Sequence, residues 1–372
     1  MANTVPTITP GSITRIKGQE AHPVYFVNLN HSMTPNLVVK GERAQGLQEG
    51  ATSIKWGSKI MKNVNNSLVD TKILTPAEIN IFKQAVMANF PPHSQQYANV
   101  APGGLTFTWT KMPFVSGLSS ADLWDGEGTG KRVDVENIKR SVIKLLDETA
   151  WFELGKVVAV DIFNGNSDRF DIGTGGHPGQ WVNKGNLLFV ASGPTTKVIG
   201  LDTFDPNTFV TPEEESNLAT GRAFDALRIL IDPGRRNTFA KACVISVGDE
   251  MKRTLQSEFA GLASFTLIIS GPTGREFLTV LVSKMDQLFL PYVPNFEQGL
   301  KQGADQLKVY LQSKVRQYAT AWKPARPQAV PWPKAPMGWQ RARPVPTGPT
   351  PAPGKTVPQG ILNRMAFLGW SV

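Results

Sequence analysis

Cysteine and histidine are scarce in this chain of 372 residues. The single cysteine, Cys243, excludes a disulfide framework and any zinc site built from several cysteines. Its neighbours Ala242, Val244 and Ile245 are apolar, so we expect a small buried hydrophobic residue at this position. The four histidines are scattered at no metal-ligand spacing, which argues against a zinc enzyme.

Long hydrophobic runs are also missing. No segment approaches the roughly 18 to 20 consecutive apolar residues that a membrane-spanning helix requires, so we expect no membrane span. The N-terminal stretch is polar and lacks the basic start and apolar block of a conventional secretory signal. The sequence therefore predicts a cytoplasmic protein, and it leaves open export by a specialised secretion system that reads other signals.

Acidic residues are absent from one part of the chain, residues 323–372. This segment contains seven of the 39 lysines and arginines and no aspartate or glutamate. The rest of the chain is nearly neutral, with 32 basic and 30 acidic residues. The net charge of +9 therefore belongs to this segment and not to a basic folded face, so we expect no nucleic-acid partner.

The same segment is rich in proline, with eleven of the 28 prolines in residues 323–358. Such a composition favours extended polyproline II structure, so residues 323–372 are predicted to form a basic, disordered tail. Arg343–Pro349 fits the pattern R-x-x-P-x-x-P that SH3 domains bind, which makes an SH3-domain protein a candidate partner. A semi-rigid linker with incidental spacing is the alternative. Ile361–Trp370 is apolar again, which leaves open that it is anchored on the body.

Short strand-like and helix-like patterns alternate along the rest of the chain. Thr75, Pro76 and Glu78 form a capping box with proline at the first helical position, which predicts the start of a helix. Alternation and helical spacing predict strands at 24–26, 37–40, 105–109, 186–190 and 198–201, and helices at 43–64, 79–90, 135–152, 249–259, 275–289 and 296–322, with a further helix start at 211. An almost continuous apolar run, 157–163, precedes a polar loop.

That polar loop, Gly165–Arg169, carries the residue types that phosphoryl transfer requires. The reaction needs a carboxylate at the acceptor hydroxyl, an oxygen-rich pair for Mg²⁺ and a cation on the phosphates. Asp168, Asn186 and Asp202 lie in the loop and at the ends of the next two predicted strands, so they are candidates for the first two roles. Lys40, which ends an earlier predicted strand, is the candidate cation.

The sequence Gly-Asn-Ser-Asp-Arg at this loop resembles the catalytic loop of atypical kinases. HipA-type toxin kinases, phosphatidylinositol kinases and secretory-pathway kinases carry G-N-x-D-R or N-x-D-R after an apolar helix. The resemblance implies that Asp168 is the catalytic carboxylate, with Arg169 beside it in the catalytic set. It also implies that Asn186 and Asp202 bind Mg²⁺ and that ATP donates the phosphoryl group.

The resemblance implies an α+β, two-lobed, protein-kinase-like fold. A flexible lead, residues 1–20, is expected before a small mixed β/α N-lobe, residues 21–115. A mostly helical C-lobe, residues 116–322, is expected to follow, and the proline-rich tail, residues 323–372, to come after it. The nucleotide would bind between the lobes.

The chain departs from this family pattern in its spacing. Asp168 and Asn186 are 18 residues apart, a longer gap than is usual, and a glycine-rich insertion between them explains it. Asn183 is a rival for the role of Asn186. Asp168 and Arg169 have a simpler interpretation as a surface ion pair beside an Asn-Gly turn.

The phosphate-binding side of the expected site is less clear. No glycine-rich loop precedes Lys40, so the turn that contains Asn30 and Ser32 is assigned to the phosphates. Glu49 is the expected carboxylate partner of Lys40, with Glu42 as its rival. Lys40 could also be an ordinary solvated lysine at a strand end.

Together these observations predict an ATP-dependent phosphotransferase that acts on a hydroxyl of a protein substrate, with export as a bacterial effector as one setting. A phosphatidylinositol-type lipid kinase is the alternative enzyme, because the same motif serves inositol lipids. A catalytically inactive pseudokinase or adaptor that recruits SH3-type partners through its tail is the alternative without chemistry.

Overall fold

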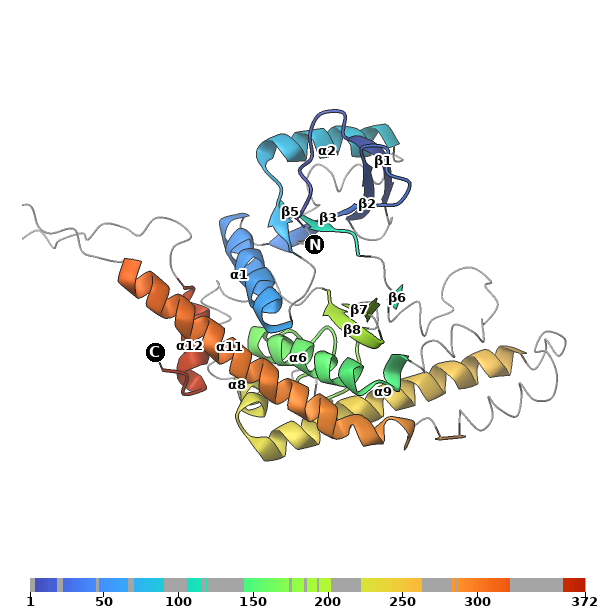
Figure 1. The fold of residues 1–372 in the computed structure, drawn as a ribbon, viewed down its shortest axis with the longest axis vertical. Coiled ribbons are helices and arrows are strands. Elements are labelled where there is room, and N and C mark those ends of the chain that lie inside the picture. Colours follow the sequence, from blue (N-terminus) through green and yellow to red (C-terminus); the bar gives the residue numbers. More distant parts are fainter. Residues whose placement is uncertain are drawn as a thin grey trace, which may run out of the picture.

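The structure is a computed structural model of the chain that describes residues 4–18, 23–44, 47–65, 70–89, 106–115, 118–119, 144–173, 176–183, 186–192, 194–201, 222–262, 283–284, 287–321 and 357–371. The fold is mixed α and β, with a five-stranded antiparallel sheet, a three-stranded sheet and long helices (Figure 1). The described residues form two hydrophobic cores, one against the larger sheet and one among the helices. We refer to these parts as the sheet unit and the helical unit.

The larger sheet has the strand order β1-β2-β3-β5-β4, and all its neighbours are antiparallel. The period of two along β2 places Tyr25, Val27 and Leu29 on one buried face of the sheet. Its strands are β1 (Ile13–Gly18), β2 (Val24–Leu29), β3 (Leu37–Ala44), β4 (Lys72–Ile73) and β5 (Thr106–Pro113). The strands predicted at 24–26, 37–40 and 105–109 are thus confirmed, whereas β1 was not predicted.

Helix α2 (Pro76–Asn89) covers the buried face of this sheet (Figure 1). Phe82 and Val86 are fully buried there. The ring of Phe82 lies 5.2 Å from that of Tyr25 and 5.4 Å from that of Trp109, measured between centroids. Aromatic contacts of this kind add to the area that the helix buries, so α2 is an integral layer of the sheet unit.

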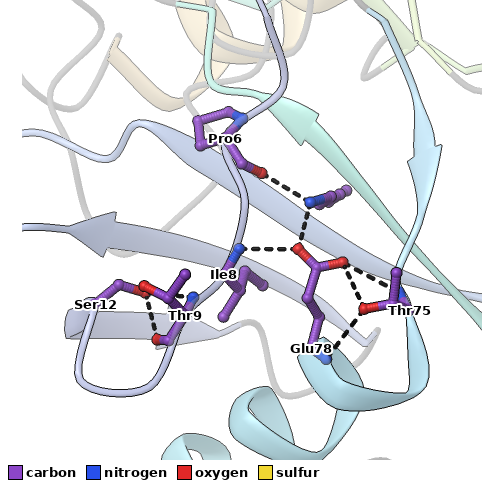
Figure 2. Close-up of polar contacts among 7 residues, drawn as sticks. Pro6, Ile8, Thr9, Ser12, Thr75 and Glu78 are labelled. Atoms are coloured by element: carbon purple, nitrogen blue, oxygen red, sulfur yellow. Dashed lines mark hydrogen bonds and ion pairs between the residues drawn. The ribbon is translucent and has the colours of Figure 1, made fainter.

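The predicted capping box begins α2 and also fastens the N-terminal segment (Figure 2). The Thr75 hydroxyl accepts the Glu78 amide at 3.3 Å, and the Glu78 carboxylate accepts the Thr75 amide at 3.1 Å. The same carboxylate accepts the Ile8 amide at 2.8 Å and forms a buried ion pair with Lys111 of β5. Lys111 also donates to the carbonyl of Pro6 at 2.8 Å. One buried carboxylate therefore joins three segments of the chain.

These contacts correct the expectation of a flexible lead over residues 1–20. Val5 and Ile8 lie in the core of the sheet unit, and residues 13–18 form an edge strand. The physical reason is the carboxylate of Glu78, which the N-terminal backbone helps to satisfy in a buried position. Residues 4–18 thus belong to the sheet unit.

Helix α1 (Leu47–Asn65) lies between the two units (Figure 1). Its residues Trp56, Ile60 and Val64 are part of the core of the helical unit. At its C-terminal end the Asn65 amide donates to the carbonyl of Val198 at 2.9 Å, a buried bond to the smaller sheet. The helix predicted at 43–64 is confirmed from Leu47 onward, whereas residues 43 and 44 belong to β3, and residues at its C-terminal end pack on the helical unit.

The helical unit is built around a close pair of helices, α6 (Glu148–Asn164) and α11 (Val293–Ala321). Gly155 and Gly299 let the two backbones touch. A Cβ atom on Gly155 would lie 2.2 Å from the carbonyl oxygen of Phe296, and one on Gly299 would lie 2.1 Å from that of Phe152. No side chain larger than hydrogen fits at either position without moving a helix.

The remaining described elements surround this pair. They are α8 (Arg222–Leu227), the 3-10 helices η2 (Arg228–Leu230) and η3 (Leu290–Tyr292), α9 (Pro233–Leu262) and α12 (Gln359–Phe367), with a small sheet β6-β7-β8 (Leu118–Ser119, Leu187–Ser192, Thr195–Gly200). The strands predicted at 186–190 and 198–201 are β7 and β8, within a few residues. No helix in the described part of the chain combines the length and apolarity needed to cross a bilayer.

Two sequence predictions about helix limits are wrong. The helix predicted at 135–152 is interrupted at residues 146–147, so only residues 148–152 of it belong to α6, which continues through the apolar run 157–163; residues 135–143 lie outside the described residues. The N-cap explains the difference, because the Asp147 carboxylate accepts the Thr149 amide at 2.8 Å and begins the helix there. The helix predicted at 249–259 is the C-terminal part of the 30-residue α9.

The expectation that residues 323–372 form a separate tail is wrong for residues 357–371. Ile361, Met365, Leu368 and Trp370 are buried in the core of the helical unit. Their apolar side chains recur on one face of α12 and its C-terminal turn, and burial of such a face is what stabilises a short helix. The rest of the predicted tail, including the Arg343–Pro349 motif, lies outside the described residues.

Candidate active site

The loop with the Asn-Ser-Asp-Arg sequence follows directly on the C-terminal end of α6. Gly165 caps the helix in the left-handed conformation, with φ of 75°, which glycine adopts without steric cost. The Asn166 amide donates to the carbonyl of Asp161 at 2.9 Å and so satisfies a carbonyl of the last turn. The chain reverses at this point, which brings residues 166–169 back beside the end of the helix.

Arg169 is the centre of the site and is completely buried. Its guanidinium forms an ion pair with Asp161 of α6. Nε and Nη2 donate to the carbonyl oxygen of Asn186 at 3.2 and 2.9 Å, and Nη2 also donates to the carbonyl of Leu201. One side chain therefore fixes the end of α6, the entry to β7 and the exit from β8 around a single point.

This burial corrects the placement of Arg169 in the catalytic set. A guanidinium that is 0% exposed cannot contact a substrate. Three protein partners occupy its donors, so its role is to position the chain around it. The interpretation of Asp168 and Arg169 as a surface ion pair is also excluded, because Arg169 pairs with Asp161.

Asp168 is exposed beside this buried centre. Its backbone amide donates to the Asn166 side-chain oxygen at 2.9 Å, and the Asn166 amide group donates to Asp161 at 3.3 Å. Within the described residues, its carboxylate forms no hydrogen bond or ion pair. The backbone of Asp168 is thus fixed, while its side chain is exposed.

Asp161 is fully buried under the loop. Burial raises the pKa of its carboxyl group to about 6, and contacts from Arg169 and Asn166 oppose that rise. Asp161 accepts a hydrogen bond from Asn166 on one oxygen and the Arg169 guanidinium on the other. Its place in the structure is that of a positioning group.

The structure describes one of the two candidate metal ligands, Asn186, but not the other, Asp202. Asn186 is 7% exposed, and its carbonyl accepts from Arg169 and from the Leu201 amide, the latter at 2.9 Å. Its rival Asn183 is exposed. Asp202 follows Leu201 in sequence but lies outside the described residues. Among the described residues no three His, Cys, Asp or Glu side chains form a metal-binding group.

The 18-residue gap between Asp168 and Asn186 is an anchored insertion. Phe170 and Trp181 pair as an isolated β-bridge and stack with centroids 6.1 Å apart. The Trp181 amide donates to the Ser246 hydroxyl of α9 at 2.7 Å. The insertion therefore closes on itself at its base, which brings Asn186 back to Arg169 despite the long gap.

Lys40 lies in β3, where it pairs with Val24 of β2 and Thr110 of β5. Its ammonium lies 3.1 Å from the Glu42 carboxylate. The ion-pair partner that the structure describes is therefore Glu42, the alternative to Glu49. Glu49 is part of α1, but its side chain lies outside the described residues.

Asn30 and Ser32 are not brought together with Lys40. They lie in the turn between β2 and β3, whereas Lys40 pairs with Val24 at the opposite end of β2. At roughly 3.3 Å per residue, the six residues from Val24 to Asn30 separate the two places by about 20 Å. The turn also uses its own polar groups, since the Ser32 hydroxyl donates to Thr34 at 2.6 Å. Their assignment to the phosphates of the same site is therefore wrong.

A second buried arginine at this loop, Arg364 of α12, was missed in the sequence. It is 1% exposed, and its Nη2 atom faces Gly165. The signal was a single basic residue within the apolar segment Ile361–Trp370. A lone charge in a segment that is otherwise buried predicts a specific partner.

Comparisons with protein-family models, with curated proteins and with solved structures give no significant match. The function of the site is therefore inferred from its own chemistry.

Proposed function

We propose that the protein is an ATP-dependent phosphotransferase that acts on a protein hydroxyl. In this proposal the sheet unit and the helical unit are the N-lobe and C-lobe of a protein-kinase-like fold. The order of elements supports it, since β1, β2, β3, α1, β4, α2 and β5 precede α6, the Asn-Ser-Asp-Arg loop, β7 and β8.

The convergence on Arg169 is the observation that carries the proposal. Its contacts to Asp161, Asn186 and Leu201 hold the loop and both strand ends of the small sheet in one place. Phosphoryl transfer depends mainly on positioning and on electrostatic stabilisation, so a rigid buried centre beside an exposed carboxylate suits it.

Each candidate residue has a distinct role in this proposal. Asp168 orients the acceptor hydroxyl and accepts its proton late in the transfer. The oxygen ligands of Asn186 and Asp202 are of the kind that Mg²⁺ prefers, and Lys40 provides a cation from the sheet unit. When bound, Mg²⁺–ATP supplies the phosphoryl group.

Two alternatives make different predictions about the acceptor. A phosphatidylinositol-type lipid kinase would transfer phosphate to inositol lipids and not to proteins. An inactive adaptor would transfer none and would act through an SH3 partner bound at Arg343–Pro349. The same transfer assay distinguishes all three.

The proposal is tested by incubating the full chain with labelled ATP, Mg²⁺ and either a cell lysate or phosphatidylinositol vesicles. We expect label on protein, and we expect Asp168→Asn to lower transfer by about a hundredfold or more, because it removes the proton acceptor. Nucleotide affinity, measured by calorimetry, should change little, since Asp168 acts mainly in the transition state.

Asp225→Asn is a matched control. Asp225 is also an exposed aspartate of the helical unit, with a side chain 58% exposed and in a surface ion pair with Arg235. Its replacement should leave transfer unchanged, because surface pairs contribute little. Label on lipid alone would favour the lipid kinase, and no label on protein, lipid or the chain itself would favour the adaptor.

A further inference from the structure

The segment that contains α12 packs against the end of α6 from which the candidate catalytic loop begins. The ring of Trp370 stacks on Phe163 with centroids 5.8 Å apart and an angle of 6° between the planes. Phe163 is the last but one residue of α6, and the loop follows after Gly165. Residues far apart in the sequence thus meet at the end of α6 that leads into the loop.

Arg364 brings a positive charge to the same place. Its Nη1 atom donates to the carbonyl of Gly360 at 3.0 Å. Its Nη2 atom would lie 3.9 Å from a Cβ atom placed on Gly165, which locates the guanidinium against the capping residue of α6. The carbonyl groups at a helix C-terminus carry partial negative charge, and a buried cation there is stabilising.

The fold fixes the position of this arginine. Ile361 and Met365, on the same face of α12, are buried in the core of the helical unit. Beyond the helix, the Trp370 amide donates to the carbonyl of Met365 at 2.8 Å, and the Gln312 side chain of α11 donates to the carbonyl of Ser371. The backbone that carries Arg364 is therefore held beside the end of α6 by the packing of the whole segment.

We propose that Arg364 is a positioning residue that holds the loop of Gly165 and Asp168 at its capping glycine. Arg169 fixes the loop to the small sheet, and Arg364 fixes its first residue to α12. The proposal rests on the proposed function for its kinetic consequence. The geometric part, a loop held by α12, can be measured without any activity.

Two readouts test the proposal on the full-length chain, with Arg364→Met as the main variant. The first is hydrogen exchange of the loop amides 165–169, which we expect to become about tenfold faster. The second is phosphate transfer, for which we expect kcat to fall by about tenfold while KM for ATP changes by less than about twofold. Arg364→Lys, which keeps the charge, should recover part of both effects.

Arg253→Met is the matched control. Arg253 lies in α9 with a side chain 76% exposed, so this variant removes one guanidinium from the surface of the same unit. Neither readout should change. If Arg364→Met does not fold, as judged by loss of protection of the α9 amides, Trp370→Leu loosens the same segment through Phe163 and takes its place.

The outcomes separate the two proposals. Faster exchange confined to the loop supports positioning, and a kcat loss with an unchanged KM extends it to catalysis. Loop exchange equal to wild type in a folded Arg364→Met or Trp370→Leu variant overturns it. If wild type transfers no phosphate, the proposed function fails, and the exchange experiment alone decides the role of Arg364.

Discussion

Replacement of Arg169 by methionine tests the buried centre of the candidate site. Methionine fills part of the same space with an uncharged, unbranched side chain, but it leaves the Asp161 carboxylate, which is 0% exposed, without its counter-charge. It also removes the donors to the carbonyls of Asn186 and Leu201. Removing one partner of a buried ion pair costs about 3–5 kcal/mol, so we expect Arg169→Met to destabilise the helical unit by that amount at pH 7.

The destabilisation should depend on pH through Asp161. In wild type the pKa of its carboxyl is about 6, above its ordinary value of 3.8, because it is buried. The native state therefore binds this proton more tightly, and the contribution of Asp161 to stability falls as pH rises through that window. Without Arg169 the folded pKa should rise further, so the cost of Arg169→Met should be smaller at pH 5 than at pH 8.

The assay uses Cys243, which is fully buried in the core of the helical unit. Burial also raises the pKa of its thiol, so it should react with a maleimide only when that unit opens. We expect Arg169→Met to lower the urea midpoint of labelling by about 1–2 M at pH 7. Adding Asp161→Asn should recover part of the loss, because no buried charge then remains. Equal losses at pH 5 and pH 8, or additive effects of the two substitutions, would refute this account.

Two further predictions concern packing and the sheet unit. Gly299→Ala should destabilise the helical unit by about 1–3 kcal/mol or more through overpacking against Phe152, measured by the same labelling. Gly234→Ala, whose Cβ would meet only ordinary contact, is its control and should be neutral or slightly stabilising. Burial alone would raise the pKa of Glu78, but hydrogen bonds from Lys111 and two backbone amides outweigh it and hold the pKa below its ordinary value of 4.5. The stability that Glu78 contributes should therefore be present above pH 4.5 and lost as pH falls further, so the melting-temperature deficit of Glu78→Gln should shrink in acid; a constant deficit would contradict the ion pair.

Local patterns predicted the elements that local physics determines. The capping box of Thr75 and Glu78 begins α2 as expected, because both partners of its hydrogen bonds lie within four residues. Strands β2, β3, β7 and β8 were recognised from apolar runs between turn residues. By contrast, β1 was missed, since Ile13–Gly18 alternates weakly and contains Arg15 and Lys17. An edge strand of this kind forms because it pairs with β2, and its own residues carry only a weak strand pattern.

The site was predicted in part for the same reason. The loop Gly165–Arg169 stood out because its residue types are rare together in a short stretch. The role of Arg169 could not be read, since burial depends on Asp161 and on carbonyl groups of two strands. The turn of Asn30 was wrongly assigned to the same site as Lys40, because the sequence does not show that Lys40 pairs with the other end of β2. Arg364 was missed because its partner is almost 200 residues away.

The late position of α12 in the chain has a consequence for synthesis. The core of the helical unit includes Ile361 and Met365 of α12, which follows α11 after a connection of 37 residues, 322–358. At roughly 5–20 residues per second, a ribosome needs about two to seven seconds to translate that connection after α11. During this interval the nascent chain carries Phe163 and its neighbours without their final cover. The helical unit can therefore complete its core only after α12 emerges from the ribosome.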